Sequence, residues 1–152
     1  MISDELRRLG IELPNVVAPL AAYTPAQKIG NTVRTSGQLP MVEGKLPLSG
    51  KVGVEVSADD AKDLARTAIL NALAAAASVA GGIDRIEKIV HVTGFVASSP
   101  DFTGQPGVIN GASELLGELF GDDGIHTRSA VGVSVLPLDA PVEIELTVLV
   151  RE

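Results

Sequence analysis

Three charged residues near the C-terminal end of the 152-residue chain could together bind and act on a small anion. Arg128 precedes a run of small and apolar residues, and Glu143 and Glu145 follow shortly after it. An arginine guanidinium can hold a carboxylate through two parallel hydrogen bonds, which a lysine cannot copy. A carboxylate side chain beside such a group can orient or deprotonate a water molecule. These residue types therefore indicate a site for a small carboxylate-bearing ligand.

Each of these residues also has an ordinary structural interpretation. Arg128 could instead pair with a neighbouring carboxylate at the start of a strand, an interaction of small energetic weight when exposed. Glu143 could be a solvent-facing residue on an edge of the sheet, and Glu145 competes with it for any role. Residue types and spacing leave both interpretations open.

Other kinds of site find little support in the sequence. His91 and His126 are the only histidines, and neither has an acidic or histidine partner at a helical metal spacing, so both are expected to be hydrogen-bonded or surface residues. There is no glycine-rich phosphate loop. Ser36, Ser113 and Ser129 lack the surroundings of a serine nucleophile. No metal ion or organic cofactor is expected.

Two strands joined by a loop must position these charged residues. Between His126 and the loop at 136–141, valines at 131, 133 and 135 share one face of the first strand, and small residues share the other. In the second strand, residues 142–150 alternate, with Glu143 and Glu145 on the face opposite the apolar one. The carboxylates are therefore expected on the non-core face.

The remaining chain predicts further helices and strands. Ser3 is expected to cap a short helix ending at Gly10, and Ser57 to cap a long helix ending at Gly81-Gly82. Further strands are expected at residues 23–29, 32–36 and 86–97, a second long helix at 108–120, irregular chain at 11–22 and an extended loop at 41–53. The expected buried face of the long helix follows the 3.6-residue period: Ala61, Leu64, Ala65, Ala68, Ala72, Leu73, Ala76 and Val79.

This order of elements is typical of an α+β or α/β sandwich with two helices on one face of a sheet. The other face then has no cover from the same chain. Because the strands at 86–97 and 142–150 are rich in apolar residues, we expect association of chains through that face.

Composition bounds the class of protein. A length of 152 residues and a hydrophobic content of 45% predict one soluble globular domain, residues 1–152. A net charge of −7 and an aromatic content of 3% argue against a nucleic-acid-binding surface. The chain has no cysteine, no apolar signal segment at its start and no run long enough to span a bilayer, so a cytoplasmic protein without a membrane partner is expected.

Several separated segments resemble one known family. They are Tyr23 ahead of a strand, Ser-Gly-Gln-Leu-Pro at 36–40, Asn110, and Arg128-Ser129 followed by Leu-Pro at 136–137 and Val-Glu-Ile-Glu at 142–145. In this order the chain is similar to the YjgF/RidA family of reactive-intermediate imine deaminases, over roughly residues 20–151. The most specific part is Arg-Ser-x-Val-x-Val-x-x-Leu-Pro, beginning at residue 128.

The resemblance implies a fold and an activity. The implied fold is chorismate-mutase-like (YjgF/RidA), with a mixed β-sheet carrying two helices on one face. The implied assembly is a homotrimer whose sheets close into an inner barrel, with ligand clefts between subunits. The implied reaction is hydrolytic deamination of 2-imino acids or enamines to 2-keto acids and ammonia. The alternatives are a non-catalytic or regulatory binder of small carboxylates, and an endoribonuclease or translation inhibitor, names that family members have carried.

The resemblance also implies roles for individual residues. Arg128 matches the arginine that holds the substrate carboxylate, and Glu143 matches the acidic residue that positions the attacking water. The implied substrate-binding positions are Tyr23, Gly37, Asn110 and Ala130. Many members have cysteine where this chain has Ala130. Residues 1–19, with their short helix, form an N-terminal extension typical of a longer branch.

Overall fold

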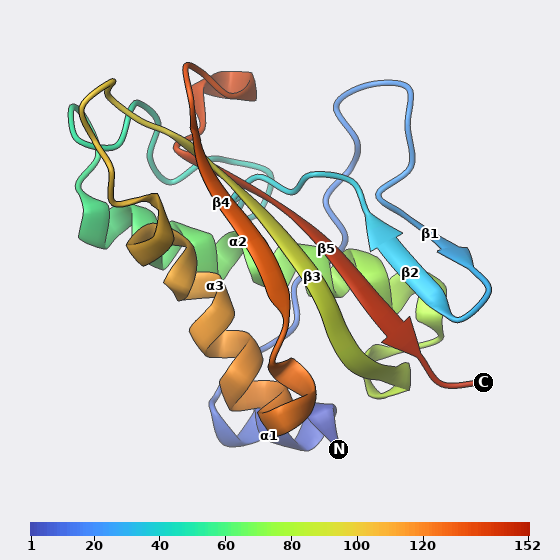
Figure 1. Cartoon of the computed structure of the whole chain (residues 1–152). Helices are drawn as coiled ribbons and strands as arrows, with labels where there is room; N and C mark the ends of the chain where they lie inside the picture. The colour runs from blue at the N-terminus through green and yellow to red at the C-terminus, as the bar shows by residue number, and fades with distance from the viewer.

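The computed structural model describes residues 1–152 as a sheet with helices packed against it (Figure 1). The helices are α1 (Ile2–Arg8), α2 (Ala58–Ala80) and α3 (Gln105–Phe120), and the strands are β1 (Ala26–Ile29), β2 (Thr32–Thr35), β3 (Ile86–Ala97), β4 (Thr127–Val133) and β5 (Val142–Val150). Short 3-10 turns occupy Ile83–Arg85, Gly121–Gly124 and Pro137–Asp139. The predicted order of strand pair, helix, strand, helix and strand pair is confirmed.

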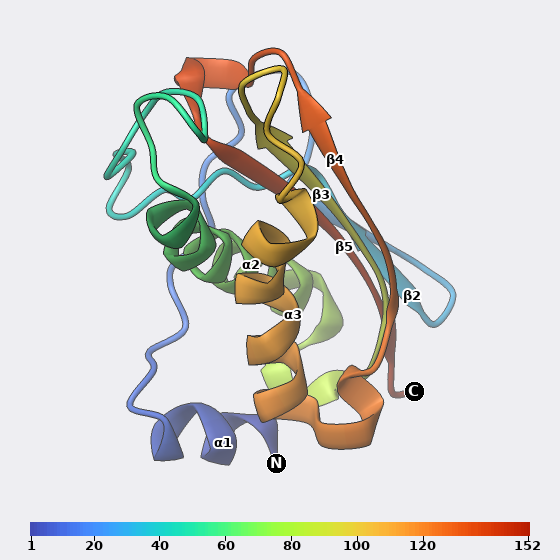
Figure 2. The same cartoon turned by 60° about the vertical axis from the view of Figure 1, so that its left-hand side comes forward.

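The five strands form one mixed sheet in the order β1-β2-β5-β3-β4. Strands β3 and β4 run parallel, and the other neighbours are antiparallel. Helix α3 makes the crossover between the parallel strands, as such a connection requires. Figure 2 shows α2 and α3 on the same side of the sheet, with the opposite side uncovered. The predicted two-helix cover of one face is confirmed.

Helix α2 begins and ends where the sequence indicates. The Ser57 hydroxyl accepts a hydrogen bond from the backbone N–H of Asp60 at 3.1 Å, which satisfies one free donor of the first turn. Gly81 ends the helix with a φ of +94°, a conformation that glycine adopts without strain. Val79, expected on the buried face, is instead 37% exposed, because it lies in the last turn, at the edge of the helix–sheet contact.

Small residues let the two long helices approach each other closely. A Cβ atom at Gly111 of α3 would lie 2.0 Å from the carbonyl oxygen of Lys62 in α2. Most of the alanines of α2 are fully buried between α3 and the sheet. The helical layer therefore sits near the sheet without large side chains between them, and α3 lies over β3 and β4.

The alternation expected for β5 is confirmed, and it separates the core from the open face. Val142, Ile144, Leu146, Val148 and Val150 are buried toward the helices. Glu143, Glu145, Thr147 and Leu149 lie on the other side. The carboxylates are thus on the non-core face, as predicted.

Strand β3 corrects one expectation about that open face. It is rich in apolar residues and lies between β5 and β4, but few of its apolar side chains are on the open face. Register shifts between Ile86 and Lys88 and between Ile89 and His91 insert extra residues, so Ile86, Ile89 and Val92 all face the core. The open face of β3 and β5 is consequently more polar than the apolar composition of these strands indicated.

The N-terminal helix is present, but Ser3 does not cap it. Met1 is the N-cap residue, and Ser3 lies inside α1. The Ser3 hydroxyl and backbone N–H donate to the carboxylate of Asp84 at 2.6 and 2.8 Å. These hydrogen bonds hold the pKa of Asp84 below its ordinary value. Ser3 therefore fastens α1 to the turn before β3.

The main differences from the predicted element boundaries are in β1, α3 and β4. Strand β1 starts at Ala26, after Pro25, and not at Tyr23. Helix α3 starts at Gln105, since Pro106 occupies the first turn, where a missing N–H costs nothing. Strand β4 ends at Val133, which leaves Val135 outside the sheet and 61% exposed. No helix is long and apolar enough to cross a membrane.

Candidate active site

Arg128 lies on β4 with its side chain on the helix-covered side of the sheet. Its register partner on β3 is Val92, which is fully buried. The guanidinium reaches helix α3. Its Nη1 donates to Asn110 Oδ1 at 2.9 Å and to Ser113 Oγ at 3.1 Å, and its Nη2 donates to the carbonyl oxygen of Pro106 at 3.0 Å.

The partners of Arg128 are all uncharged. None of the ion pairs within 4.0 Å in the structure includes Arg128, so the structural interpretation in which it pairs with a neighbouring carboxylate is wrong. A guanidinium has five N–H donors, and the three bonds above leave Nε–H and one hydrogen of Nη2 without a partner in the chain. Nε and Nη2 share one edge of the guanidinium, which matches the two oxygens of a carboxylate.

Sequence reasoning missed two residues behind Arg128. Ser113 Oγ lies 2.9 Å from His126 Nε2, and His126 Nδ1 lies 2.6 Å from the carbonyl oxygen of Gly124. The expectation that His126 is hydrogen-bonded is confirmed, but its connection to Arg128 was not foreseen. The available signal was the spacing of Asn110 and Ser113, three residues apart and therefore on one face of a helix.

Glu143 occupies the open face of the sheet. Its neighbours Val142 and Ile144 are buried in the core, so its side chain points the other way. A Cβ atom at Gly37 would lie 2.5 Å from Glu143 Oε2, so this glycine makes room for the carboxylate. Burial, followed by repulsion from Glu145, raises the pKa of Glu143 above the ordinary glutamate value. A half-buried carboxyl with a raised pKa is suited to accept and return a proton.

Glu145 has a different environment two residues further along β5. Its Oε2 lies 3.6 Å from Arg34 Nη2, whereas Glu143 has no cation within 4.0 Å. Glu145 and Arg34 line a polar cavity of about 360 Å³ together with Tyr23. Because its charge is partly balanced by Arg34, Glu145 is the less suitable of the two carboxylates for proton transfer.

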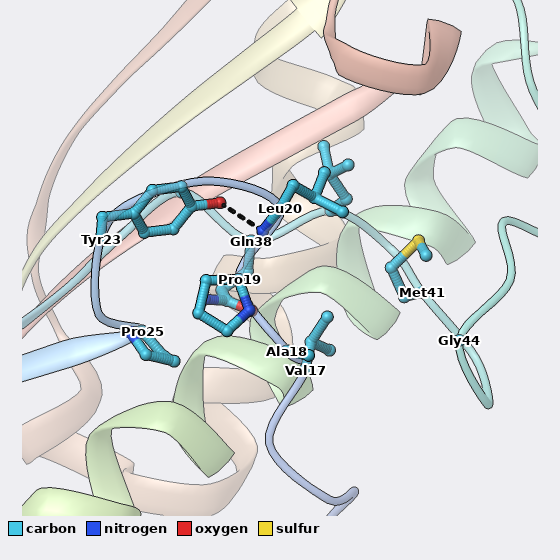
Figure 3. Close-up of a pocket in the computed structure, with 11 residues that line it drawn as sticks. Val17, Ala18, Pro19, Leu20, Tyr23, Pro25, Gln38, Met41 and Gly44 are labelled. Atoms are coloured by element: carbon cyan, nitrogen blue, oxygen red, sulfur yellow. Dashed lines mark hydrogen bonds between the residues drawn. The ribbon is translucent and has the colours of Figure 1, made fainter.

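Tyr23 and Gly37 line a separate apolar cavity of about 200 Å³ (Figure 3). Tyr23 lies just before β1, and its hydroxyl accepts a hydrogen bond from the backbone N–H of Leu20 at 3.3 Å. The segment at 17–20 and Met41 supply other walls. Gly37 borders this cavity and also contacts Glu143, so it connects the cavity wall to the carboxylate.

The six site residues named from the sequence form two groups on opposite faces of the sheet. Arg128 and Asn110 are joined by a hydrogen bond, and Ala130, two residues along β4, lies on the same helix-covered side. The other group consists of Tyr23, Gly37 and Glu143. Strand β3 separates β4 from β5, so the two groups do not meet within one chain. No cluster of three or more histidine, aspartate or glutamate side chains is arranged to hold a metal ion.

Comparison with known proteins gives the family. Residues 4–149 match the family model described as "YjgF/chorismate mutase-like, putative endoribonuclease". The chain is 36% identical to Protein TCP17 of Trypanosoma cruzi over 148 residues, which cover 97% of this chain and 92% of the relative. It is 30% identical to a 2-iminobutanoate/2-iminopropanoate deaminase of Dermatophagoides farinae over 142 residues, covering 93% and 95% of the two chains.

A solved structure agrees with the fold. The crystal structure named as a putative endoribonuclease from Shewanella oneidensis superposes with a TM-score of 0.94 at 32% identity, covering 99% of each chain. The chain therefore belongs to the YjgF/RidA family and has its α+β fold.

Proposed function

We propose that this protein hydrolyses 2-imino acids, or their enamine tautomers, to 2-keto acids and ammonia. In this proposal the protein is a homotrimer, and each site lies in a cleft between two subunits. One subunit contributes Arg128, Asn110 and Ala130, and its neighbour contributes Tyr23, Gly37 and Glu143. A cytoplasmic location and action without a cofactor remain predictions from the sequence.

The reaction follows from the chemistry of the two charged groups. The unpartnered N–H donors of Arg128 bind the substrate carboxylate, and the positive charge withdraws electron density from the adjacent imine carbon. Glu143 takes a proton from water as the water oxygen bonds to the carbon of the protonated imine, and the electron pair of the carbon–nitrogen double bond moves to the nitrogen, which gives a neutral carbinolamine. The carbon–nitrogen bond then breaks. Glu143 gives its proton to the nitrogen, ammonia leaves with the electron pair of the broken bond, and the hydroxyl oxygen forms the carbonyl of the 2-keto acid as its proton passes to the released ammonia.

The observation that carries this proposal is that the guanidinium of Arg128 has no counter-ion in its own chain. Its charge has no carboxylate partner in its own chain, and its Nε–H and one N–H of Nη2 have no hydrogen-bond partner there. A partly buried charge without a counter-ion is costly unless a ligand supplies one. The raised pKa of Glu143 supports the second half of the site, because such a carboxyl can carry a proton between water and the leaving amine.

The test is ammonia release from imino acids generated in the assay by an amino acid oxidase. We expect the protein to raise the rate above the spontaneous hydrolysis of the imine, without added metal. Arg128→Ala at the same concentration is the matched control. A rate equal to that of the buffer, over side chains of several sizes, would rule out the deaminase.

A second candidate function is a non-catalytic binder of small carboxylates. The Arg128 group favours it, because Asn110, Ser113 and Pro106 hold the guanidinium without any help from Glu143. A binder would take up 2-keto acids and release no ammonia from imines. Glu143→Gln would then have no effect on any measured property of the ligand complex.

The endoribonuclease named in the family description and for the Shewanella structure has less support in this chain. A net charge of −7 opposes the approach of a polyanion, and the 3% of aromatic residues supply few surfaces for base stacking. Incubation of RNA with a nuclease-free preparation and with Arg128→Ala would show cleavage that depends on this site if the function were RNA processing.

A further inference from the structure

A series of hydrogen bonds continues from Nη1 of Arg128 toward the turn that precedes β4. Arg128 Nη1 contacts Ser113 Oγ at 3.1 Å, Ser113 Oγ contacts His126 Nε2 at 2.9 Å, and His126 Nδ1 contacts the carbonyl oxygen of Gly124 at 2.6 Å. This series of hydrogen bonds links β4, helix α3, the segment before β4 and the 3-10 turn at Gly121–Gly124.

The donor and the acceptor of each of these hydrogen bonds can be assigned by starting from the carbonyl of Gly124, where the series ends. A carbonyl oxygen can only accept, so His126 carries its proton on Nδ1. In the neutral imidazole Nε2 is then an acceptor, and the Ser113 hydroxyl must donate to it. The Ser113 proton is thereby turned toward His126, and the oxygen lone pairs are left for the N–H of Arg128.

We infer that Ser113 and His126 are positioning residues for Arg128: they hold one side of the guanidinium so that its opposite edge is aimed at a carboxylate before the ligand arrives. This inference rests on the proposed function for its ligand, and it adds two residues that the family resemblance did not supply. An arginine side chain has large rotamer freedom, and fixing it in advance removes part of the entropy cost of binding.

The contacts of Ser113 indicate that it positions Arg128 and contributes little to the folding of the protein. Ser113 and Asn110 are half-buried, whereas Ile109, Ala112 and Leu116 carry the packing of α3 onto the core. Removing one hydroxyl leaves that packing intact. Asn110 and Pro106 also remain as partners, so Arg128 is expected to become mobile and not to be lost from the site.

The binding experiment measures the Kd of 2-ketobutyrate, the stable product of 2-iminobutanoate hydrolysis, by calorimetry. We expect Ser113→Ala to raise Kd about three- to tenfold, a part of the effect of losing a whole charge-assisted hydrogen bond. Ser113→Thr keeps a hydroxyl and should restore the affinity. His126→Leu should resemble Ser113→Ala, and His126→Gln, whose amide oxygen can accept from Ser113, should resemble the wild type.

Ser78→Ala is the matched control, because the Ser78 hydroxyl donates to the carbonyl of Ala75 on α2 and touches nothing at the site. Its Kd for 2-ketobutyrate should not change. If Ser113→Ala and His126→Leu lower the melting temperature while Kd stays at the wild-type value, the two residues are structural and the inference is wrong.

A second measurement does not depend on any ligand. Rotation of the Arg128 guanidinium can be followed by NMR of its side-chain nitrogens, assigned by their loss in Arg128→Lys. We expect slow rotation in the wild type and in Ser113→Thr, and faster rotation in Ser113→Ala and His126→Leu. Equal rotation in all four overturns the inference. If the wild type binds no 2-keto acid, the proposed function fails while this measurement still decides whether Ser113 and His126 hold Arg128.

Discussion

At the scale of single residues, Arg128 is held by neutral groups and keeps two N–H donors without a partner in the chain. We predict that Arg128→Lys, which keeps the charge but loses the planar fork, weakens binding of a 2-keto acid about ten- to a hundredfold. A charge-assisted hydrogen bond is worth roughly 1.5–3 kcal/mol, which corresponds to this range. Arg128→Ala should bind more weakly still and nearly abolish deamination.

The Arg128 variants must be compared with the wild type for folding and assembly as well as for activity. A ligand clamp predicts that the alanine variant keeps its melting temperature and its oligomer mass, and a purely structural arginine predicts that both fall together with activity. Melting, light scattering and imine hydrolysis should be measured on the same preparation. A stable and fully active Arg128→Ala protein would remove the basis for the deaminase proposal.

Glu143 gives a prediction about turnover. Glu143→Gln should keep affinity for the 2-keto acid and lower turnover about 10²- to 10⁴-fold, because an amide can bond to water but cannot take its proton. Parallel measurement of Kd and of the ammonia-release rate checks this. Unchanged turnover would assign the water to Glu145 or to a backbone group.

The raised pKa of Glu143 adds a prediction about stability. A raised pKa means that the folded state holds this proton more tightly than the unfolded chain. The stability that comes from this group is present below the unfolded pKa and is lost as the pH rises through the folded value. We therefore expect Glu143→Gln to melt at a higher temperature than the wild type at neutral pH, with the difference vanishing below about pH 4. A lower melting temperature at neutral pH would mean that the ionised carboxylate stabilises the fold.

At the scale of elements, the end of β2 places Gly37 against the carboxylate of β5. We predict that Gly37→Ala displaces Glu143 and reduces turnover with little effect on folding. The added Cβ would lie 2.5 Å from Glu143 Oε2, and the φ of Gly37 lies outside the left-handed region, so the backbone accepts alanine. Turnover and melting temperature are the two measurements.

Gly117 in α3 is the matched control for Gly37. Nothing lies within 4 Å of a Cβ built at Gly117, and its φ also lies outside the left-handed region. Gly117→Ala should keep full activity and gain stability of roughly 0.5–1 kcal/mol from the better helix propensity of alanine. An equal loss of activity in both variants would show a general effect of glycine replacement and not a displaced carboxylate.

Local rules predict most elements of this fold. The Ser57 cap, the Gly81 terminus and the alternation of β5 are each determined by neighbouring residues, and all three are confirmed. The predictions that were wrong concern features that depend on contacts between residues distant in the sequence. Ser3 is attracted to Asp84 and not to its own helix terminus, and the register shifts of β3 arise from pairing with β5.

The site shows the same division. Residue types and the family pattern single out Arg128 and Glu143. They do not show that the two side chains lie on opposite faces of the sheet. Ser113 and His126 were missed because a serine on a helix and a histidine before a strand are ordinary residues until the fold brings them together.

At the scale of the whole molecule, one chain holds two separated halves of the proposed site. We predict a homotrimer, with light scattering at micromolar concentration reporting about three times the chain mass. The uncovered sheet face and the composite site motivate this, although the polar side chains on that face make the interface less apolar than the strand sequences indicated. A monodisperse monomer would contradict both the trimer and the cleft between subunits.

Mixing two inactive variants tests whether the two halves come from different chains. Arg128→Ala retains an intact Glu143 half, and Glu143→Gln retains an intact Arg128 half. If each site takes one half from each of two neighbouring subunits, co-expression in equal amounts gives random mixtures in which about a quarter of the interfaces combine both intact halves. We therefore expect about a quarter of the wild-type rate from the mixture and almost none from either variant alone. Separately purified variants that are combined without exchanging subunits serve as the control and should stay inactive. If both halves of a site came from one chain, every site in the mixture would contain a defect. The co-expressed mixture would then be as inactive as its parents.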